Sequence, residues 1–199
     1  MGGFGLPLRV LYLLLFIGAL LISGTYRKRA RQASGTIARS SEGAGGLLGR
    51  AVMGFSTLAA ILLHALAPQW MAWASLPLPD WARWVGVALG WAVLPFMIWV
   101  FRSIGANISE TVLTKSDHHL VMAGPYQWIR HPLYLAGLTL IASLALIAGS
   151  WLLGLLCLIG IMIFRWVVIP AEERNLVDKF GPAYEAYSQR TGALLPRLR

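Results

Sequence analysis

Residues 130–173 read RHPLYLAGLTLIASLALIAGSWLLGLLCLIGIMIFRWVVIPAEE, and this stretch decides the fold. It holds two apolar runs, about 132–148 and about 151–169, with little more than Ala-Gly-Ser between them. So short a link forces two helices into a tight antiparallel hairpin. The two open ends of the hairpin then lie side by side. This predicts that Arg130 and His131 lie next to Glu172 and Glu173.

Apolar sequence extends through most of the chain. Of the 199 residues, 57% are hydrophobic and 13% are charged, which is too apolar for an ordinary soluble protein. Three more apolar runs approach the roughly 20 residues that cross a bilayer, at about 8–23, 47–66 and 81–101. We therefore predict an all-α, multi-pass integral membrane protein with five transmembrane helices. Phe180, Tyr184 and Tyr187 follow the last one at helical spacing, which predicts a cytoplasmic amphipathic helix at the C-terminus.

The net charge of +9 carries information about membrane orientation. The basic residues lie between and after the apolar runs rather than on one amphipathic face, which argues against a nucleic-acid partner. Cytoplasmic loops are enriched in Lys and Arg. An external N-terminus places most of the basic residues inside, and only Arg9 and Arg83 near the external span ends. The expected cytoplasmic residues are Arg27, Lys28, Arg29, Arg31, Arg39, Arg102, Lys115, Arg130, Arg174, Lys179, Arg190, Arg197 and Arg199.

Several kinds of site are excluded by the residues present. Cys157 is the single cysteine, so the chain has no intramolecular disulfide and no cysteine metal cluster. His118 and His119 are adjacent, without further ligands at a spacing typical of zinc, and we predict no metal. The chain has no GxGxxG, Walker or GxSxG motif. Any cofactor must therefore be held by the loops that cap the hairpin.

The polar residues at the hairpin ends allow two interpretations. Pro132 is suited to the first position of a helix, and Arg130 could simply anchor that helix at the interface by extending to lipid headgroups. Glu172 and Glu173 could likewise complement the positive end of a helix dipole. The functional interpretation is that the arginine pairs with a carboxylate of a ligand, and that a glutamate faces a cation or a ribose hydroxyl.

Read together, the motifs HHLVMAGPYQWIRHPLY (118–134), the hairpin, and EERNLVDKFGPAYEAYSQRTGALLP (172–196) resemble the isoprenylcysteine carboxyl methyltransferase family and the related phospholipid methyltransferases. The resemblance covers about residues 103–199, whereas the first two spans match only in topology. It implies that residues 102–199 form a catalytic methyltransferase region of loop, hairpin and tail. Residues 1–101 would supply three N-terminal transmembrane helices with a basic cytoplasmic loop.

The resemblance also implies S-adenosyl-L-methionine as the methyl donor, bound on the cytoplasmic side without a Rossmann domain. A lipophilic small molecule or lipid from the bilayer would be the acceptor. Arg130, Glu172 and Arg165 are the candidate catalytic residues. Carried over by position, the donor site consists of His118, His119, Leu120, Val121, Tyr126, Arg130, His131, Pro132, Leu133, Tyr134 and Glu172.

One position departs from the family pattern. The isoprenylcysteine enzymes have an arginine four residues before the glutamate of the donor site, and this chain has Val168 there. Arg165 lies about one helical turn earlier, where a charge inside a span is costly. The acceptor is therefore left open between an isoprenylcysteine-like carboxylate, a lipid amine and a thiol. An NADPH-dependent membrane reductase of the sterol-reductase type, and a non-enzymatic membrane scaffold, are the alternatives.

Overall fold

The computed structural model describes residues 4–34, 44–105 and 120–197. These residues are mostly helical, and they contain two isolated bridges but no β-strand. The α-helices are α1 (Leu6–Ser34), α2 (Ala44–Leu66), α3 (Asp80–Ile104), α4 (Pro132–Ala148), α5 (Trp151–Ile163), α6 (Ile169–Phe180) and α7 (Pro182–Arg190). Short 3-10 helices span Pro68–Ala74 and Gly124–Gln127, and a π-helical turn spans Phe164–Val168. The predicted all-α class is confirmed for the described residues.

Three helices in the described part are long and apolar enough to cross a membrane: Leu6–Gln32, Asp80–Ile104 and Trp151–Phe180. The bent pair Ala51–Leu66 and Pro68–Ala74 adds a fourth if it is counted as one span. The predicted span Pro132–Ala148 is helical, but its 17 residues extend about 26 Å, against roughly 30 Å of hydrocarbon. The chain is an integral membrane protein, and the number of five spans stays a prediction.

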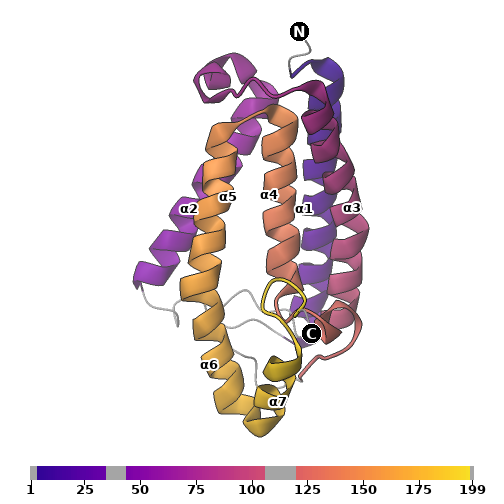
Figure 1. The fold of residues 1–199 in the computed structure, drawn as a ribbon, viewed down its shortest axis with the longest axis vertical. Helices are drawn as coiled ribbons and strands as arrows, with labels where there is room; N and C mark the ends of the chain where they lie inside the picture. The colour runs from indigo at the N-terminus through magenta and orange to yellow at the C-terminus, as the bar shows by residue number, and fades with distance from the viewer. Residues whose placement is uncertain (1–3, 35–43, 106–119, 198–199) are drawn as a thin grey trace.

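Helix α4 occupies the middle of the bundle, between α5 and the α1–α3 pair (Figure 1). Its approach to α3 is close at Gly86, where a Cβ would lie 2.8 Å from the Leu146 Cβ and 2.9 Å from the Ser143 carbonyl oxygen. Glycine allows this backbone approach because it has no side chain. The α3–α4 contact therefore fixes the position of the helix that begins at the Arg-His-Pro motif.

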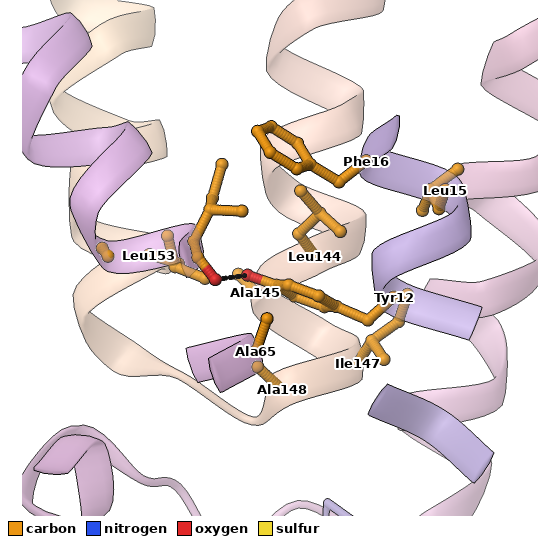
Figure 2. Packing of buried hydrophobic residues seen from close by; sticks show 11 residues of the cluster. Tyr12, Leu15, Phe16, Ala65, Leu144, Ala145, Ile147, Ala148 and Leu153 are labelled. Carbon is orange, nitrogen blue, oxygen red and sulfur yellow. Dashed lines mark hydrogen bonds between the residues drawn. The ribbon is translucent and has the colours of Figure 1, made fainter. Parts of the chain in front are cut away.

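The main apolar cluster joins four helices. Figure 2 shows Tyr12, Leu15 and Phe16 of α1 packed against α4, with Ala65 of α2 and Leu153 of α5 nearby. The Tyr12 hydroxyl donates to the carbonyl oxygen of Ile61 at 3.2 Å, so the phenol is satisfied inside the cluster.

The turn between α4 and α5 consists of two residues with clear local roles. Gly149 ends α4 in the left-handed conformation, with φ 64°, as glycine does at many helix ends. Ser150 caps α5 by accepting a hydrogen bond from the Leu153 amide at 3.2 Å. Arg83 of α3 donates to the carbonyl oxygen of Ile147 at 2.8 Å, near the end of α4. The hairpin turn is therefore held by α3 as well as by its own sequence.

Helix α5 continues into α6 through the π-helical turn, so Trp151–Phe180 forms one helix of 30 residues. The Ile169 amide bonds to the carbonyl oxygen of Phe164, five residues earlier. Pro170 has no amide hydrogen and crowds the carbonyl four residues before it, and a wider turn relieves this crowding. The π-helical turn lies directly before Pro170, as this crowding requires. At about 45 Å the helix exceeds the hydrocarbon thickness, so α6 extends beyond the membrane core.

Candidate active site

The polar site lies at the end of the bundle where α4 begins and α6 leaves, opposite the Gly149 turn (Figure 1). Pro132 is the first residue of α4, and His131 is its cap. The Arg130 Nε donates to Glu173 Oε1 at 2.7 Å, across 43 positions of sequence. The predicted proximity of the two hairpin ends is confirmed by this ion pair. It uses Glu173, a residue absent from the candidate donor and catalytic sets.

Arg130 also holds the C-terminal segment. Its Nη1 donates to the carbonyl oxygen of Ser188 at 2.9 Å and to that of Thr191. These carbonyls lie at the end of α7, where helix carbonyls lack intrahelical partners. The side chain of Arg130 is 13% exposed, which makes the contact with Glu173 stronger than a surface ion pair. Arg130 therefore joins α6, α7 and the start of α4.

Backbone hydrogen bonds join the same two segments. The Arg130 amide donates to the carbonyl oxygen of Gly192 at 2.9 Å, and the His131 amide donates to the carbonyl oxygen of Ala193 at 3.0 Å. In the other direction, the Gly192 amide donates to Trp128 at 3.1 Å. The Tyr187 hydroxyl donates to the carbonyl oxygen of Tyr126 at 2.7 Å. Residues 187–193, named here the C-terminal strap, are therefore part of the site's framework.

His131 lies between the two glutamates. Its Nε2 is 3.2 Å from Glu173 Oε1, and its Nδ1 is 3.4 Å from Glu172 Oε2. Burial alone would lower the pKa of His131, but hydrogen bonds and charge from Glu172 and Glu173 outweigh burial and raise that pKa. A protonated ring donates from both nitrogens. His131 thus fixes the carboxylates of two adjacent residues in different directions.

Glu173 is held in its ionised form. Burial alone would raise its pKa, but hydrogen bonds from His131 and Arg130, with their positive charges, lower the pKa to about 2. The carboxylate therefore stays charged at every physiological pH, and both contacts are charge-assisted.

Glu172 differs from Glu173 because aromatic side chains surround it. Its Oε2 accepts a hydrogen bond from the Tyr134 hydroxyl at 2.8 Å, and its side chain is 27% exposed. The Tyr134 ring stacks on Phe164 with 4.4 Å between centroids, and on His131 with 5.5 Å. A carboxylate beside stacked aromatic faces can bind a cation. Phe164 was not among the predicted residues, since one phenylalanine in an apolar span gives no signal.

The remaining predicted residues have varied surroundings. Tyr126 and Pro132 are buried, while Leu120, Val121 and Leu133 are half-buried. Burial raises the pKa of Tyr126, with charge from Glu172 acting in the same direction. His118 and His119 lie outside the described residues.

Arg165 differs from the other predicted residues. It is exposed on the π-helical turn, and within the described residues no hydrogen bond or ion pair joins it to Glu172 or Glu173. Val168, at the position of the family arginine, is half-buried in the same turn. The structure therefore brings Arg130, His131, Tyr134 and Glu172 together and leaves Arg165 apart from them.

Comparison with known proteins agrees with the motifs. The model of the "Isoprenylcysteine carboxyl methyltransferase (ICMT) family" matches residues 84–178. The cobalt-zinc-cadmium resistance protein CzcN of Cupriavidus metallidurans is 33% identical over 84 residues, 42% of this chain and 38% of CzcN. The protein-S-isoprenylcysteine O-methyltransferase of Schizosaccharomyces pombe is 31% identical over 96 residues, 47% of this chain and 41% of the enzyme.

The fold has a solved counterpart as well. It is similar to the structure of the eukaryotic intramembrane Ras methyltransferase ICMT, with a TM-score of 0.53 and 22% identity over 95% of this chain and 72% of that one. The chain spans about two fifths of the length of the curated relatives it matches. The match to the isoprenylcysteine carboxyl methyltransferase family model over residues 84–178 includes Arg130, His131, Tyr134, Glu172 and Glu173, and it agrees with the resemblance carried by the motifs.

Proposed function

We propose that the chain is an S-adenosyl-L-methionine-dependent membrane methyltransferase that acts on a lipophilic acceptor. The observation that carries this proposal is the arrangement of Glu172, Tyr134 and Phe164 within the family segment. A carboxylate held by a phenol, beside stacked aromatic rings, suits a ligand that combines a sulfonium, an adenine and ribose hydroxyls. The proposed orientation has the N-terminus outside and the site on the cytoplasmic side, as the basic residues predict.

The proposed donor site is the predicted one. Glu172 accepts hydrogen bonds from hydroxyls or an ammonium of the donor. Arg130 uses its Nε and Nη1 within the protein, and its Nη2 is assigned to the donor's carboxylate. His131 positions both glutamates. The other donor-site residues proposed are His118, His119, Leu120, Val121, Tyr126, Pro132, Leu133 and Tyr134.

Methyl transfer from a sulfonium requires little acid–base catalysis by the protein. Bound S-adenosyl-L-methionine supplies an activated methyl group, which transfers in line as its bond to sulfur breaks and a bond to the acceptor forms. The residues of this chain would align the two reactants and exclude water. The hairpin can do both, because its polar end receives a polar donor and its apolar flank faces the bilayer. The acceptor class stays open, since Val168 replaces the family arginine and Arg165 is exposed away from Glu172.

The test is ligand binding by the purified protein in lipid nanodiscs. We expect S-adenosylhomocysteine, the demethylated product, to bind and to raise the unfolding temperature, and NADPH to do neither. Glu172→Gln should weaken binding about tenfold or more, because a hydrogen bond to a charged group is lost. Glu185→Gln, at an exposed glutamate of α7, is the matched control and should bind normally.

Labelled S-adenosyl-L-methionine with a native lipid extract then identifies the acceptor that becomes labelled. Stabilisation by NADPH alone would overturn the proposal in favour of a reductase. Normal binding of S-adenosylhomocysteine by both Glu172→Gln and Arg130→Ala would refute the assignment of the donor site.

A further inference from the structure

Two tyrosines of α7 are equally buried and differ in how their hydroxyls are satisfied. Tyr184 is 2% exposed and Tyr187 is 4% exposed. The Tyr187 hydroxyl donates to the carbonyl oxygen of Tyr126 at 2.7 Å. The Tyr184 hydroxyl has no hydrogen-bond partner within the described residues. A buried polar group without a partner is costly and rare in folded proteins, so this hydroxyl calls for an explanation.

The position of Tyr184 on α7 places it toward the polar site. Residues 184, 187, 188 and 191 are spaced as one face of a helix. Tyr187 bonds to Tyr126, and the carbonyl oxygens of Ser188 and Thr191 accept from Arg130. Tyr184 lies on the same face, one turn closer to α6.

The charges that act on the Tyr184 phenol belong to the same site. Burial raises the pKa of Tyr184, Glu173 raises it further, and Arg130 opposes this effect. The phenol is therefore protonated at neutral pH and can donate a hydrogen bond. Arg130 is a neighbour that can also donate to a ligand, because within the described residues its Nη2 makes no hydrogen bond.

We infer that the Tyr184 hydroxyl is a ligand-binding group, which donates a hydrogen bond to the α-carboxylate at the amino acid end of the methyl donor. The Tyr184 hydroxyl and the Nη2 of Arg130 would both donate hydrogen bonds to this carboxylate, while Glu172 would accept hydrogen bonds from other groups of the methyl donor. This inference rests on the proposed function, and it adds one residue of α7 to the proposed donor site. Packing alone does not explain the Tyr184 hydroxyl, since a phenylalanine ring would fill the same space.

The test compares Tyr184→Phe with Tyr187→Phe in full-length protein in nanodiscs. Calorimetry measures binding of S-adenosylhomocysteine and of 5′-methylthioadenosine, which lacks the amino acid end. We expect Tyr184→Phe to weaken S-adenosylhomocysteine binding about tenfold and to leave 5′-methylthioadenosine binding unchanged. Its ligand-free unfolding temperature should stay the same or rise by about 2–4 °C, because an unsatisfied buried hydroxyl is removed.

Tyr187→Phe is the matched control, and its ligand-free unfolding temperature should fall, because the carbonyl of Tyr126 loses its donor. Equal affinity of Tyr184→Phe and wild type for S-adenosylhomocysteine would overturn the inference. So would an equal loss for both ligands together with a lower unfolding temperature, which marks a packing role. If the wild-type protein bound neither ligand, the proposed function would fail first, and the inference with it.

Discussion

Replacing Glu173 by glutamine removes a carboxylate that both Arg130 and His131 contact, at 2.7 Å and 3.2 Å. The substitution keeps the shape of the side chain and removes its charge. Arg130 would retain its hydrogen bonds to Ser188 and Thr191, but its positive charge would lose the partner that compensates it. We therefore expect a loss of stability that begins where α6 and the C-terminal strap meet the start of α4.

The size of this loss follows from the charge state of Glu173. A carboxyl whose pKa moves from 4.5 to about 2 is stabilised by about 3 kcal/mol at neutral pH. The side chain of Glu173 is 25% exposed, so solvent screening reduces the contribution. We expect Glu173→Gln to lower the free energy of unfolding by about 2 kcal/mol, or the unfolding temperature by about 4–8 °C.

Thermal unfolding in nanodiscs measures this loss, and Glu172→Gln is the control within the same helical turn. Glu172 accepts from the neutral Tyr134 hydroxyl and lies 3.4 Å from His131 Nδ1, which is longer than either contact of Glu173. Its replacement should therefore cost only about 1 kcal/mol of stability and should mainly weaken binding of S-adenosylhomocysteine. Limited proteolysis should also cut the C-terminal strap faster in Glu173→Gln than in wild type. Wild-type stability of Glu173→Gln, or a larger loss for Glu172→Gln, would refute the assignment of Glu173 as the structural member of the pair.

Two further predictions concern pH and helix packing. Glu173, with its lowered pKa, stabilises the fold above about pH 4.5, and this contribution is lost as pH falls toward 2. His131, with its raised pKa, contributes fully below its ordinary pKa of 6.5, and this contribution is lost as pH rises through the raised value. Unfolding temperatures measured from pH 3 to pH 9 should therefore be highest between about 4.5 and 6.5, and Glu173→Gln should flatten both sides of the profile; an unchanged profile would contradict the pairing. Gly86→Ala should cost about 1–3 kcal/mol, because its Cβ would lie 2.8 Å from Leu146, whereas Gly137→Ala, with nothing within 4 Å, should be neutral or stabilising by under about 1 kcal/mol. Equal unfolding temperatures for the two glycine variants would refute close packing of α3 and α4.

The proximity of the two hairpin ends could be predicted from sequence, because a Gly-Ser link leaves two helices no room to separate. The pairing within the site could not. Which of Glu172 and Glu173 faces Arg130 depends on the rotation of α6 about its axis. The π-helical turn at Phe164–Val168 adds a residue and so changes that rotation for everything after it. A proline such as Pro170 disturbs the helical turn before it, but the residue type alone determines neither the kind of irregularity nor its effect on the rotation.

The C-terminal strap shows a second limit of sequence reasoning. The spacing of Tyr184 and Tyr187 predicted an amphipathic helix, and the structure buries both rings. The contacts that hold the strap are mainly carbonyl oxygens, such as those of Ser188 and Thr191. Any residue type supplies a carbonyl oxygen, so no sequence pattern marks the partners of Arg130.

The π-helical turn connects the polar cluster of the proposed site with exposed residues of the same helix. Phe164 begins the turn and stacks on Tyr134, which in turn bonds to Glu172. The next residues, Arg165 and Trp166, are exposed on the flank of the helix. One aromatic stack therefore links the polar cluster to the π-helical turn. If the polar cluster binds the donor, we expect residues of this turn to influence the choice of acceptor, and Val168 is the residue of the turn that departs from the family pattern.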